Sequence, residues 1–370
     1  MNRISVTRSA GALAVLTLGI AGCSSSKPAE TTTSTGSSSS SSAASSSSSS
    51  SATESSSSSA SESSTGTGEA ASSITAPAKA SKEYNLSFIQ GVAGDEFYIS
   101  MQCGIEAEAA KLGVKVNTQG PQKFDPTLQK PIVDSVAAGK PDAILVAPTD
   151  VTAMQAPLAA AAAAGSKIVL VDTTLNDPSI AVTGIASDNL GGGKAAFDAI
   201  KQLKPEGGKV LVMSTDPGVS TVDARVKGFE EAVKTDSKFE YVGVQYSHND
   251  PATAAQLISA QMQKDPDIVG VFAANLFAAE GTATGLRQAG KAGTVSVVGF
   301  DAGPNQVKAL KEGTVQALVA QQPATIGQYG VDAAVTALDG GTVPKLVQTG
   351  FSVITKDNVE GNAAIYQSKC

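Results

Sequence analysis

Acidic and amide side chains, one arginine and two aromatic rings recur in this sequence directly after short apolar runs. The set is Asp95, Phe97, Tyr98, Asp172, Arg225, Asn249, Asn275, Asp301 and Gln321. Carboxylates only accept hydrogen bonds, amides donate and accept, and a guanidinium donates in a planar fork. A sugar or polyol offers hydroxyl groups that do both, and C–H faces that can lie on an aromatic ring. These residue types therefore suit a small polyhydroxy ligand.

An anionic ligand fits this set of residues poorly, whereas purely structural roles fit some of its members equally well. A phosphate fits poorly, because the three aspartates would repel an anion and only Arg225 offsets them. Phe97 and Tyr98 could equally be core residues of a helix. An aspartate after a strand is often a helix N-cap, and we interpret Asp150 and Asp188 in this way. Glu96 is interpreted as a favourable charge in the first turn of a helix.

No cofactor, metal site or catalytic residue is predicted. His248 is the only histidine, and a single histidine in a loop is a weak signal for a base or a metal ligand. The run from Gly191 to Lys194 lacks the upstream glycine and the following Ser or Thr of a phosphate loop.

The side chains must be positioned by alternating strands and helices. Short apolar runs such as AILVA (143–147), KIVLV (167–171) and IVGVFA (268–273) alternate with helical stretches such as 98–112, 151–164 and 190–203. Fully apolar strands of this kind indicate parallel sheets covered by helices on both faces. Spacing alone leaves open a closed barrel or two doubly wound lobes, and in both the ligand lies at the carboxyl ends of the strands.

The N-terminal part predicts export. Arg3 and Arg8 precede a short apolar run that ends in Ile20-Ala21-Gly22-Cys23, a secretory signal whose end resembles a bacterial lipobox. That resemblance implies a signal peptide over 1–22 and a lipid on Cys23. Residues 23–82 are mostly Ser, Thr, Ala and Gly, so we predict a disordered linker between the lipid and the folded part.

Composition and cysteine count limit the remaining choices. The chain has 370 residues and a formal net charge of −7 without a basic cluster, so nucleic acid is not an expected partner. Cys103 and Cys370 are the cysteines left after Cys23. Outside the cytoplasm an even remainder favours a disulfide, and two buried free thiols are the alternative.

Several stretches together resemble the type I periplasmic binding proteins, most closely the ribose-binding-like lipoproteins of sugar ABC importers. The matching stretches include DEFYISMQCGIEAEAAKLGV, AILVAPTD, IVLVDTT, DARVKGFEEAV, VSVVGFDAGP and VAQQPATIGQYGV. The resemblance implies two doubly wound lobes joined by a three-segment hinge. It assigns 83–187 plus 322–350 to one lobe and 188–321 plus 351–370 to the other.

The same resemblance implies a function for the opening set of residues. They would bind a monosaccharide or small polyol in the cleft between the lobes, and a monomer would deliver it to a membrane permease from the outer face of the cell membrane. Asn249 stands where the family often has an aromatic ring. Thr173 and Ala147 replace an arginine and an asparagine of the ribose-like pattern, which puts ribose itself in doubt.

Two alternatives remain at this stage. A glycoside hydrolase would need two carboxylates flanking a bond, and Asp95 with Asp301 could supply them, although the absence of Trp disfavours a grip on a sugar polymer. A sugar-sensing lipoprotein without a transport role would use the same pocket.

Overall fold

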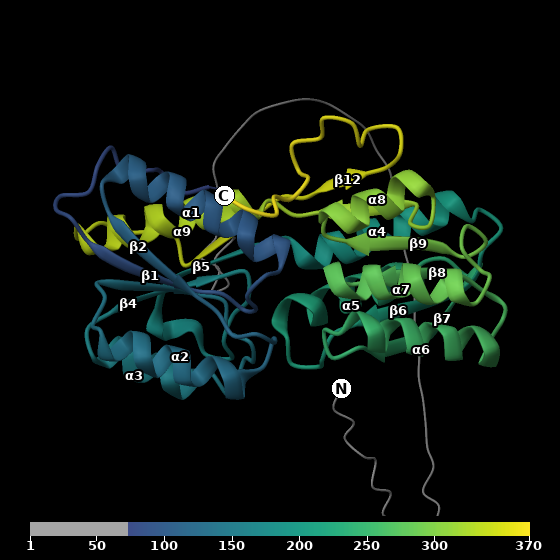
Figure 1. Cartoon of the computed structure of the whole chain (residues 1–370), viewed down its shortest axis with the longest axis horizontal. Coiled ribbons are helices and arrows are strands. Elements are labelled where there is room, and N and C mark those ends of the chain that lie inside the picture. The colour runs from purple at the N-terminus through teal and green to yellow at the C-terminus, as the bar shows by residue number, and fades with distance from the viewer. Residues whose placement is uncertain (1–72) are drawn as a thin grey trace, which may run out of the picture. The chain divides into compact units, whose positions relative to one another are not determined.

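The computed structural model describes residues 73–370, which belong to one compact unit. The predicted signal peptide, Cys23 and most of the predicted linker lie outside the described residues. The described part contains two six-stranded sheets, each flanked by helices (Figure 1). The predicted fold class, two doubly wound α/β lobes dominated by parallel strands, is confirmed.

The first sheet has the strand order β11-β5-β4-β3-β1-β2, and all its pairs are parallel. Its strands are β1 (Asn85–Ile89), β2 (Lys115–Gln119), β3 (Ala143–Val146), β4 (Lys167–Val171), β5 (Ala181–Ser187) and β11 (Leu346–Thr349). Its helices are α1 (Glu96–Leu112), α2 (Pro126–Ala138), α3 (Gln155–Ala163) and α9 (Pro323–Leu338), with a short 3-10 helix, η1, at Pro178–Ile180.

The second sheet has the order β12-β10-β9-β8-β6-β7. Its strands are β6 (Gly208–Ser214), β7 (Phe239–Tyr246), β8 (Ile268–Ala273), β9 (Ser296–Phe300), β10 (Ala317–Ala320) and β12 (Ser352–Ile354). Its helices are α4 (Asn189–Leu203), α5 (Ser220–Val233), α6 (Pro251–Lys264), α7 (Leu276–Gln288) and α8 (Pro304–Glu312).

Alternating side chains of each central strand bury into two different cores. In β3, Leu145 packs in the cluster that contains α1 and α9 residues, whereas Ile144 and Val146 pack in the cluster that contains α2 and α3 residues. In the second sheet, the same alternation separates Leu211 from Val210. Because both faces are covered, the strands read as continuous apolar runs, and this is the pattern the sequence displays.

The chain passes between the sheets three times. It leaves the first sheet after β5, returns between β10 and α9, and leaves again between β11 and β12. The three crossing segments are hydrogen-bonded to one another. The Ser187 hydroxyl donates to the Gln321 side-chain oxygen at 2.8 Å and lies 3.4 Å from the Thr349 hydroxyl.

Some elements differ from the sequence prediction. β11 was not predicted, because LVQT alternates exposed and buried residues over only four positions. The helix predicted over 151–164 begins only at Gln155, since Asp150 and the residues after it form a turn. β12 pairs antiparallel with β10, so the second sheet is not entirely parallel.

The folded part begins before residue 83. Ile74 is only 8% exposed, the Ala80 N–H donates to the Leu112 carbonyl, and the Ser81 N–H donates to the Asp339 carboxylate at 3.2 Å. The stretch predicted as linker therefore includes residues that pack on α1 and α9. Over residues 73–370, no helix combines the length and apolar character needed to cross a bilayer.

Candidate ligand-binding site

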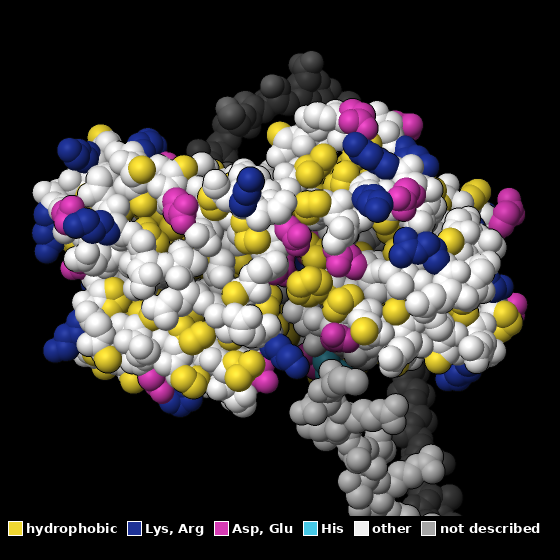
Figure 2. Space-filling model, viewed as in Figure 1, with side chains coloured by type: hydrophobic (Ala, Val, Ile, Leu, Met, Phe, Trp, Pro, Cys, Tyr) yellow, Lys and Arg dark blue, Asp and Glu magenta, His cyan; other side chains and the backbone are white. Residues whose placement is uncertain are grey.

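One pocket gathers all the residues that the sequence singled out for ligand binding. The pocket together with the open solvent at its mouth holds about 420 Å³ free of protein atoms. It is lined by Asp95, Phe97, Tyr98, Asp172, Arg225, Asn249, Asn275, Asp301 and Gln321. These residues follow strands of both sheets or begin the helices after them. Acidic side chains also cluster near the middle of the face in Figure 2. The carboxyl ends of the two sheets thus contribute jointly to one polar pocket.

The start of α1 supplies an acid and two aromatic rings. Asp95 is the N-cap of this helix, and one carboxylate oxygen accepts the Phe97 N–H at 2.8 Å. Burial raises the pKa of Asp95 well above its usual range, and the nearby Asp301 charge adds to this effect. The Phe97 and Tyr98 rings are buried and meet edge to face with centroids 5.1 Å apart. Capping and ligand contact are therefore compatible roles for Asp95.

Two aspartates occupy strained backbone positions at strand ends. Asp172 follows β4 with φ 64°, and Asp301 follows β9 with φ 78°. Residues other than glycine rarely adopt positive φ, and such strain concentrates at functional sites. The Tyr98 hydroxyl donates to Asp172 at 2.8 Å. Burial raises the pKa of Asp172 to about 6, against the opposing effects of Arg225 and the Tyr98 hydrogen bond.

Asp301 is held by donors from three directions. One carboxylate oxygen accepts the Gln321 amide at 2.7 Å and the Tyr366 hydroxyl at 3.0 Å. The other oxygen accepts the Leu276 N–H at 3.0 Å, at the first residue of α7. These bonds fix the orientation of the carboxylate at the pocket wall.

Arg225 on α5 brings the positive charge. It is only 3% exposed, and its guanidinium lies 3.8 Å from the centre of the Phe300 ring. Its Nε donates to the Asn189 side chain and its Nη1 to the Ala274 carbonyl, both at 2.8 Å. Within residues 73–370, Nη2 has no protein partner among these hydrogen bonds, so it is free to donate into the pocket.

The amides on the second sheet form a linked pair. The Asn275 side-chain oxygen accepts the Ala278 N–H and caps α7, while its amide donates to the Asn249 oxygen at 2.6 Å. Asn249 has a positive φ of 53° in the loop after β7. The capping bond leaves the two amides preoriented toward the pocket.

Sequence reasoning missed five further lining residues, namely Phe124, Thr215, Val219, Thr221 and Val222. Phe124 had a signal, because it lies in the connection from a strand to a helix, between β2 and α2. A Cβ on Gly91 would lie 2.3 Å from the Tyr98 hydroxyl and 2.6 Å from the Phe124 ring. Glycine at this position therefore allows two aromatic side chains to approach one strand end.

Other expectations concern residues outside the pocket. Asp188 caps α4 by accepting the Gly191 N–H at 2.9 Å. Asp150 accepts the Thr152 and Ala153 N–H groups and caps the turn before α3, not the helix itself. His248 is exposed and pairs with Asp216 beside the pocket.

Cys103 on α1 and Cys370 are joined by a disulfide with their Cα atoms 5.2 Å apart. The alternative of two free thiols therefore does not describe this structure. Cys23, for which lipidation was predicted, lies outside the described residues.

Comparison with known proteins identifies the family to which this chain belongs. The profile of the periplasmic binding protein domain matches residues 86–342. The ribose import binding proteins of Bacillus subtilis and Salmonella typhimurium are 30% and 31% identical. Their alignments cover 74% and 77% of this chain, and 88% and 95% of the relatives.

Solved structures agree with this result. A solute-binding protein of an ABC transporter from Agrobacterium vitis, bound with α-D-tagatopyranose, is 40% identical with a TM-score of 0.76, over 77% of this chain and 100% of that one. A second from the same organism, with bound D-fucose, is 31% identical with a TM-score of 0.73, over 76% and 100%. The chain is therefore a member of the periplasmic binding protein family, a family of substrate-binding proteins and not of enzymes.

Proposed function

We propose that this protein is an extracytoplasmic lipoprotein that captures a monosaccharide or small polyol and delivers it to an ABC importer. The observation that carries the proposal is the single pocket lined by Asp95, Asp172, Arg225, Asp301 and Gln321 together with aromatic rings. The relatives named as ribose import binding proteins and the neighbours bound to monosaccharides support the same ligand class.

The chemistry of the lining matches a neutral polyhydroxy ligand. The carboxylates of Asp172 and Asp301 accept from sugar hydroxyls, and the free Nη2 of Arg225 donates to a hydroxyl or ring oxygen. Because these groups are buried, a ligand that lacks one hydroxyl leaves a protein group unpaired, and this makes discrimination steep.

The apolar face of the sugar would lie against rings from the first sheet. Phe97 and Phe124 line the pocket from segments of the first sheet, whereas Asn249 lines it from the loop after β7 of the second sheet. Aromatic rings of the first-sheet segments therefore stack on the sugar, and the Asn249 and Asn275 amides of the second-sheet segments offer hydrogen bonds. This asymmetry favours a ligand with one apolar and one hydroxyl-rich face.

Capture would couple binding to closure of the two lobes, 83–187 plus 322–350 and 188–321 plus 351–370. A ligand that contacts residues of both sheets binds the closed state better and shifts the population toward it. The closed protein would then be recognised by the permease as a monomer.

A thermal-shift panel tests the ligand class. The full chain carrying Cys23→Ser would be screened against D-tagatose, D-fucose, D-arabinose, D-allose and small polyols. Binding to the native state raises the midpoint of unfolding with ligand concentration. A panel without a shift would contradict the proposed ligand class.

The anchor needs a separate test. The proposal expects wild-type protein in the membrane fraction with a lipid on Cys23, and Cys23→Ser protein without it. Mass measurement of the N-terminal peptide distinguishes the two. Co-purification of a permease with the wild-type chain separates a transport role from a purely sensing one.

A further inference from the structure

The segment after β12 runs from the second sheet to the first helix of the first sheet. The Tyr366 N–H donates to the Ala302 carbonyl at 3.0 Å, next to the strand end of β9. One residue later, the Gln367 N–H donates to the Ser100 hydroxyl on α1 at 2.7 Å. Cys370 is then bonded to Cys103, one turn further along α1. We call residues 362–370 the strap.

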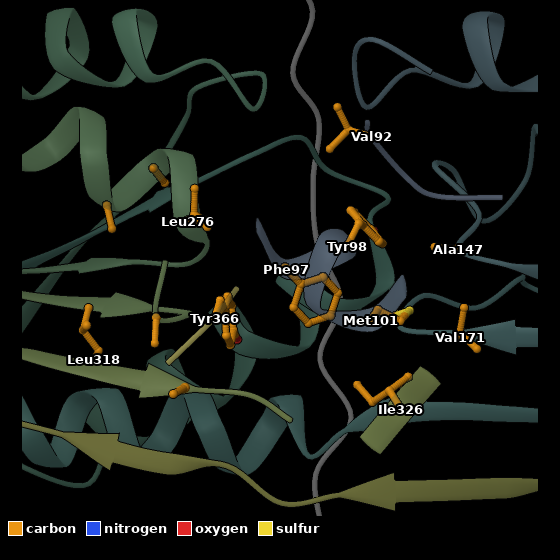
Figure 3. Packing of buried hydrophobic residues seen from close by; sticks show 14 of the residues in the cluster. Val92, Phe97, Tyr98, Met101, Ala147, Val171, Leu276, Leu318, Ile326 and Tyr366 are labelled. Atoms are coloured by element: carbon orange, nitrogen blue, oxygen red, sulfur yellow. The ribbon is translucent and has the colours of Figure 1, made fainter. Parts of the chain in front are cut away.

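Tyr366 is the point at which the strap meets the pocket residues. It is 5% exposed, its hydroxyl donates to Asp301, and the same oxygen accepts the Gln321 N–H at 3.0 Å. Its ring lies 5.9 Å from that of Phe97, and Figure 3 shows Phe97 between Tyr98 and Tyr366. Tyr366 does not line the pocket itself. It contacts three residues that do.

We infer that Tyr366 is a positioning residue for the ligand, and that the Cys103–Cys370 disulfide holds it in place. Asp301 must present its remaining lone pairs to a ligand hydroxyl, and Tyr366 with Gln321 fixes that orientation. Gln321 belongs to the second crossing between the sheets, so the same hydroxyl joins the pocket to the hinge.

The strap is fixed at its two ends. A cavity separates it from the crossing segment, with Gln322, Pro323 and Ala324 on one side and Asn362, Ala364 and Ile365 on the other. The Tyr366 ring packs in the hydrophobic core beside Phe97. The backbone at Tyr366 is held by the hydrogen bond to Ala302 on one side, and by Ser100 and the disulfide on the other.

This inference rests on the proposed function, and a matched pair of variants tests it. Tyr366→Phe removes the hydroxyl that bonds Asp301 and keeps the ring. Tyr84→Phe is the control, because Tyr84 is also buried and its hydroxyl donates to an aspartate, Asp339, at 2.6 Å, away from the pocket. Both would be made in the full chain with Cys23→Ser and titrated with D-tagatose in a calorimeter.

We expect Tyr366→Phe to weaken D-tagatose binding at least tenfold and Tyr84→Phe to change it less than twofold. Because Tyr366 acts through Asp301, adding Tyr366→Phe to Asp301→Asn should cause no further loss. Equal affinities for Tyr366→Phe and wild type would overturn the inference. The inference would also be overturned if the affinity losses of the two single variants multiplied in the double variant, since this would indicate an effect of Tyr366 that is independent of Asp301.

The disulfide is tested with Cys103→Ser plus Cys370→Ser. We expect binding to weaken severalfold, and we expect no added loss when the same change is made in Tyr366→Phe. Affinity unchanged by removal of the disulfide would overturn its role in holding Tyr366. This variant also serves if Tyr366→Phe does not fold.

Hydrogen exchange at Gln321 provides a readout without any ligand. The backbone N–H of Gln321 donates to the Tyr366 hydroxyl. Exchange of this backbone hydrogen in the ligand-free chain should therefore accelerate at least tenfold in Tyr366→Phe and stay unchanged in Tyr84→Phe. If no sugar of the panel binds wild type, the proposed function falls and the positioning role falls with it, whereas this measurement still shows whether the Tyr366 hydroxyl holds Gln321. Unchanged exchange at Gln321 in Tyr366→Phe would overturn the inference.

Discussion

Within residues 73–370, acidic side chains are buried in two regions, and in one of these regions the acids line a pocket that a ligand can fill. In the pocket, Asp172 and Asp301 receive hydroxyl, amide and backbone donors, and Arg225 lies nearby. Between α1 and α9, Glu108 and Asp332 are 7% and 3% exposed and face each other, with Lys111 bonded to Glu108.

The two regions treat a buried negative charge differently. One side-chain oxygen of Asp332 has no hydrogen-bond partner in the described chain. Burial, followed by the charge of Glu108 and the hydrogen bond with it, raises the pKa of Asp332 to about 7. In the pocket, the acids are oriented by donors and left open toward a cavity. The hydrogen-bond donors around a buried acid therefore decide whether it is oriented to bind a ligand or only lowers the stability of the folded state.

The largest effect should come from removing the pocket cation. Arg225→Met removes the buried positive charge that opposes the rise in the pKa of Asp172, and leaving a buried charge without its opposite charge costs roughly 3–5 kcal/mol. We expect sugar affinity to fall more than a hundredfold by calorimetric titration. Arg287→Met, at an exposed position in the last turn of α7, is the matched control. Binding within threefold of wild type in Arg225→Met would remove the contrast between the two regions.

The acidic pair between α1 and α9 should instead affect stability. The folded pKa of Asp332 lies above its usual value of 3.8, so the folded state keeps a proton that the unfolded chain releases. Stability attributable to this group is therefore present below about pH 4, and it falls as the pH rises to about 7. Asp332→Asn supplies a permanent donor to Glu108 and should stabilise the protein at pH 8 by about 1–3 kcal/mol, the cost range of an unsatisfied buried group.

Denaturant unfolding at pH 5 and pH 8 measures this effect. The gain should shrink at pH 5, and sugar affinity should not change at either pH. Asp134→Asn is the control, since this aspartate forms an exposed pair with Lys130 on α2 and should change stability by less than about 0.5 kcal/mol. A stability gain from Asp332→Asn that is equal at both pH values would contradict the claim that Asp332 keeps a proton in the folded state.

A smaller effect is expected from pH on binding. Asp172 has its pKa raised to about 6, and a sugar hydroxyl donates a stronger hydrogen bond to the ionised carboxylate than to the protonated acid. Affinity should therefore fall as the pH drops below about 6, by at most about tenfold per pH unit for one proton. Titrations between pH 5 and pH 8 measure it, with Asp172→Asn as the reference. A flat profile in wild type would indicate that Asp172 does not meet a hydroxyl.

Much of the fold and the pocket could be predicted because the strands are apolar and the chemistry stands at their ends. KIVLV and VSVVGF alternate with helical stretches, and this order placed Asp172 and Asp301 at the carboxyl ends of strands, where a ligand is expected. β11 could not be predicted, since its four residues carry no continuous apolar run. The division into two lobes and the lobe boundaries entered only through the family resemblance.

The parts that were missed depend on contacts between distant segments. Glu108 and Asp332 look like solvated charges on two helices until the helices pack together. Tyr366 lies in an irregular segment without a periodic pattern, and its partners Asp301 and Gln321 are 65 and 45 residues away. Phe124 belongs to a loop whose approach to Tyr98 is set by the packing around Gly91. No local pattern carries such information.

The most direct test of the account is a calorimetric titration of wild type and Asp301→Ala with the sugar that gives the largest thermal shift. We expect one binding site per wild-type chain. We expect a loss of roughly 2–3 kcal/mol in Asp301→Ala, because the Gln321, Tyr366 and Leu276 donors then lose their buried acceptor. Equal affinities in the two proteins would contradict the claim that this pocket binds the sugar.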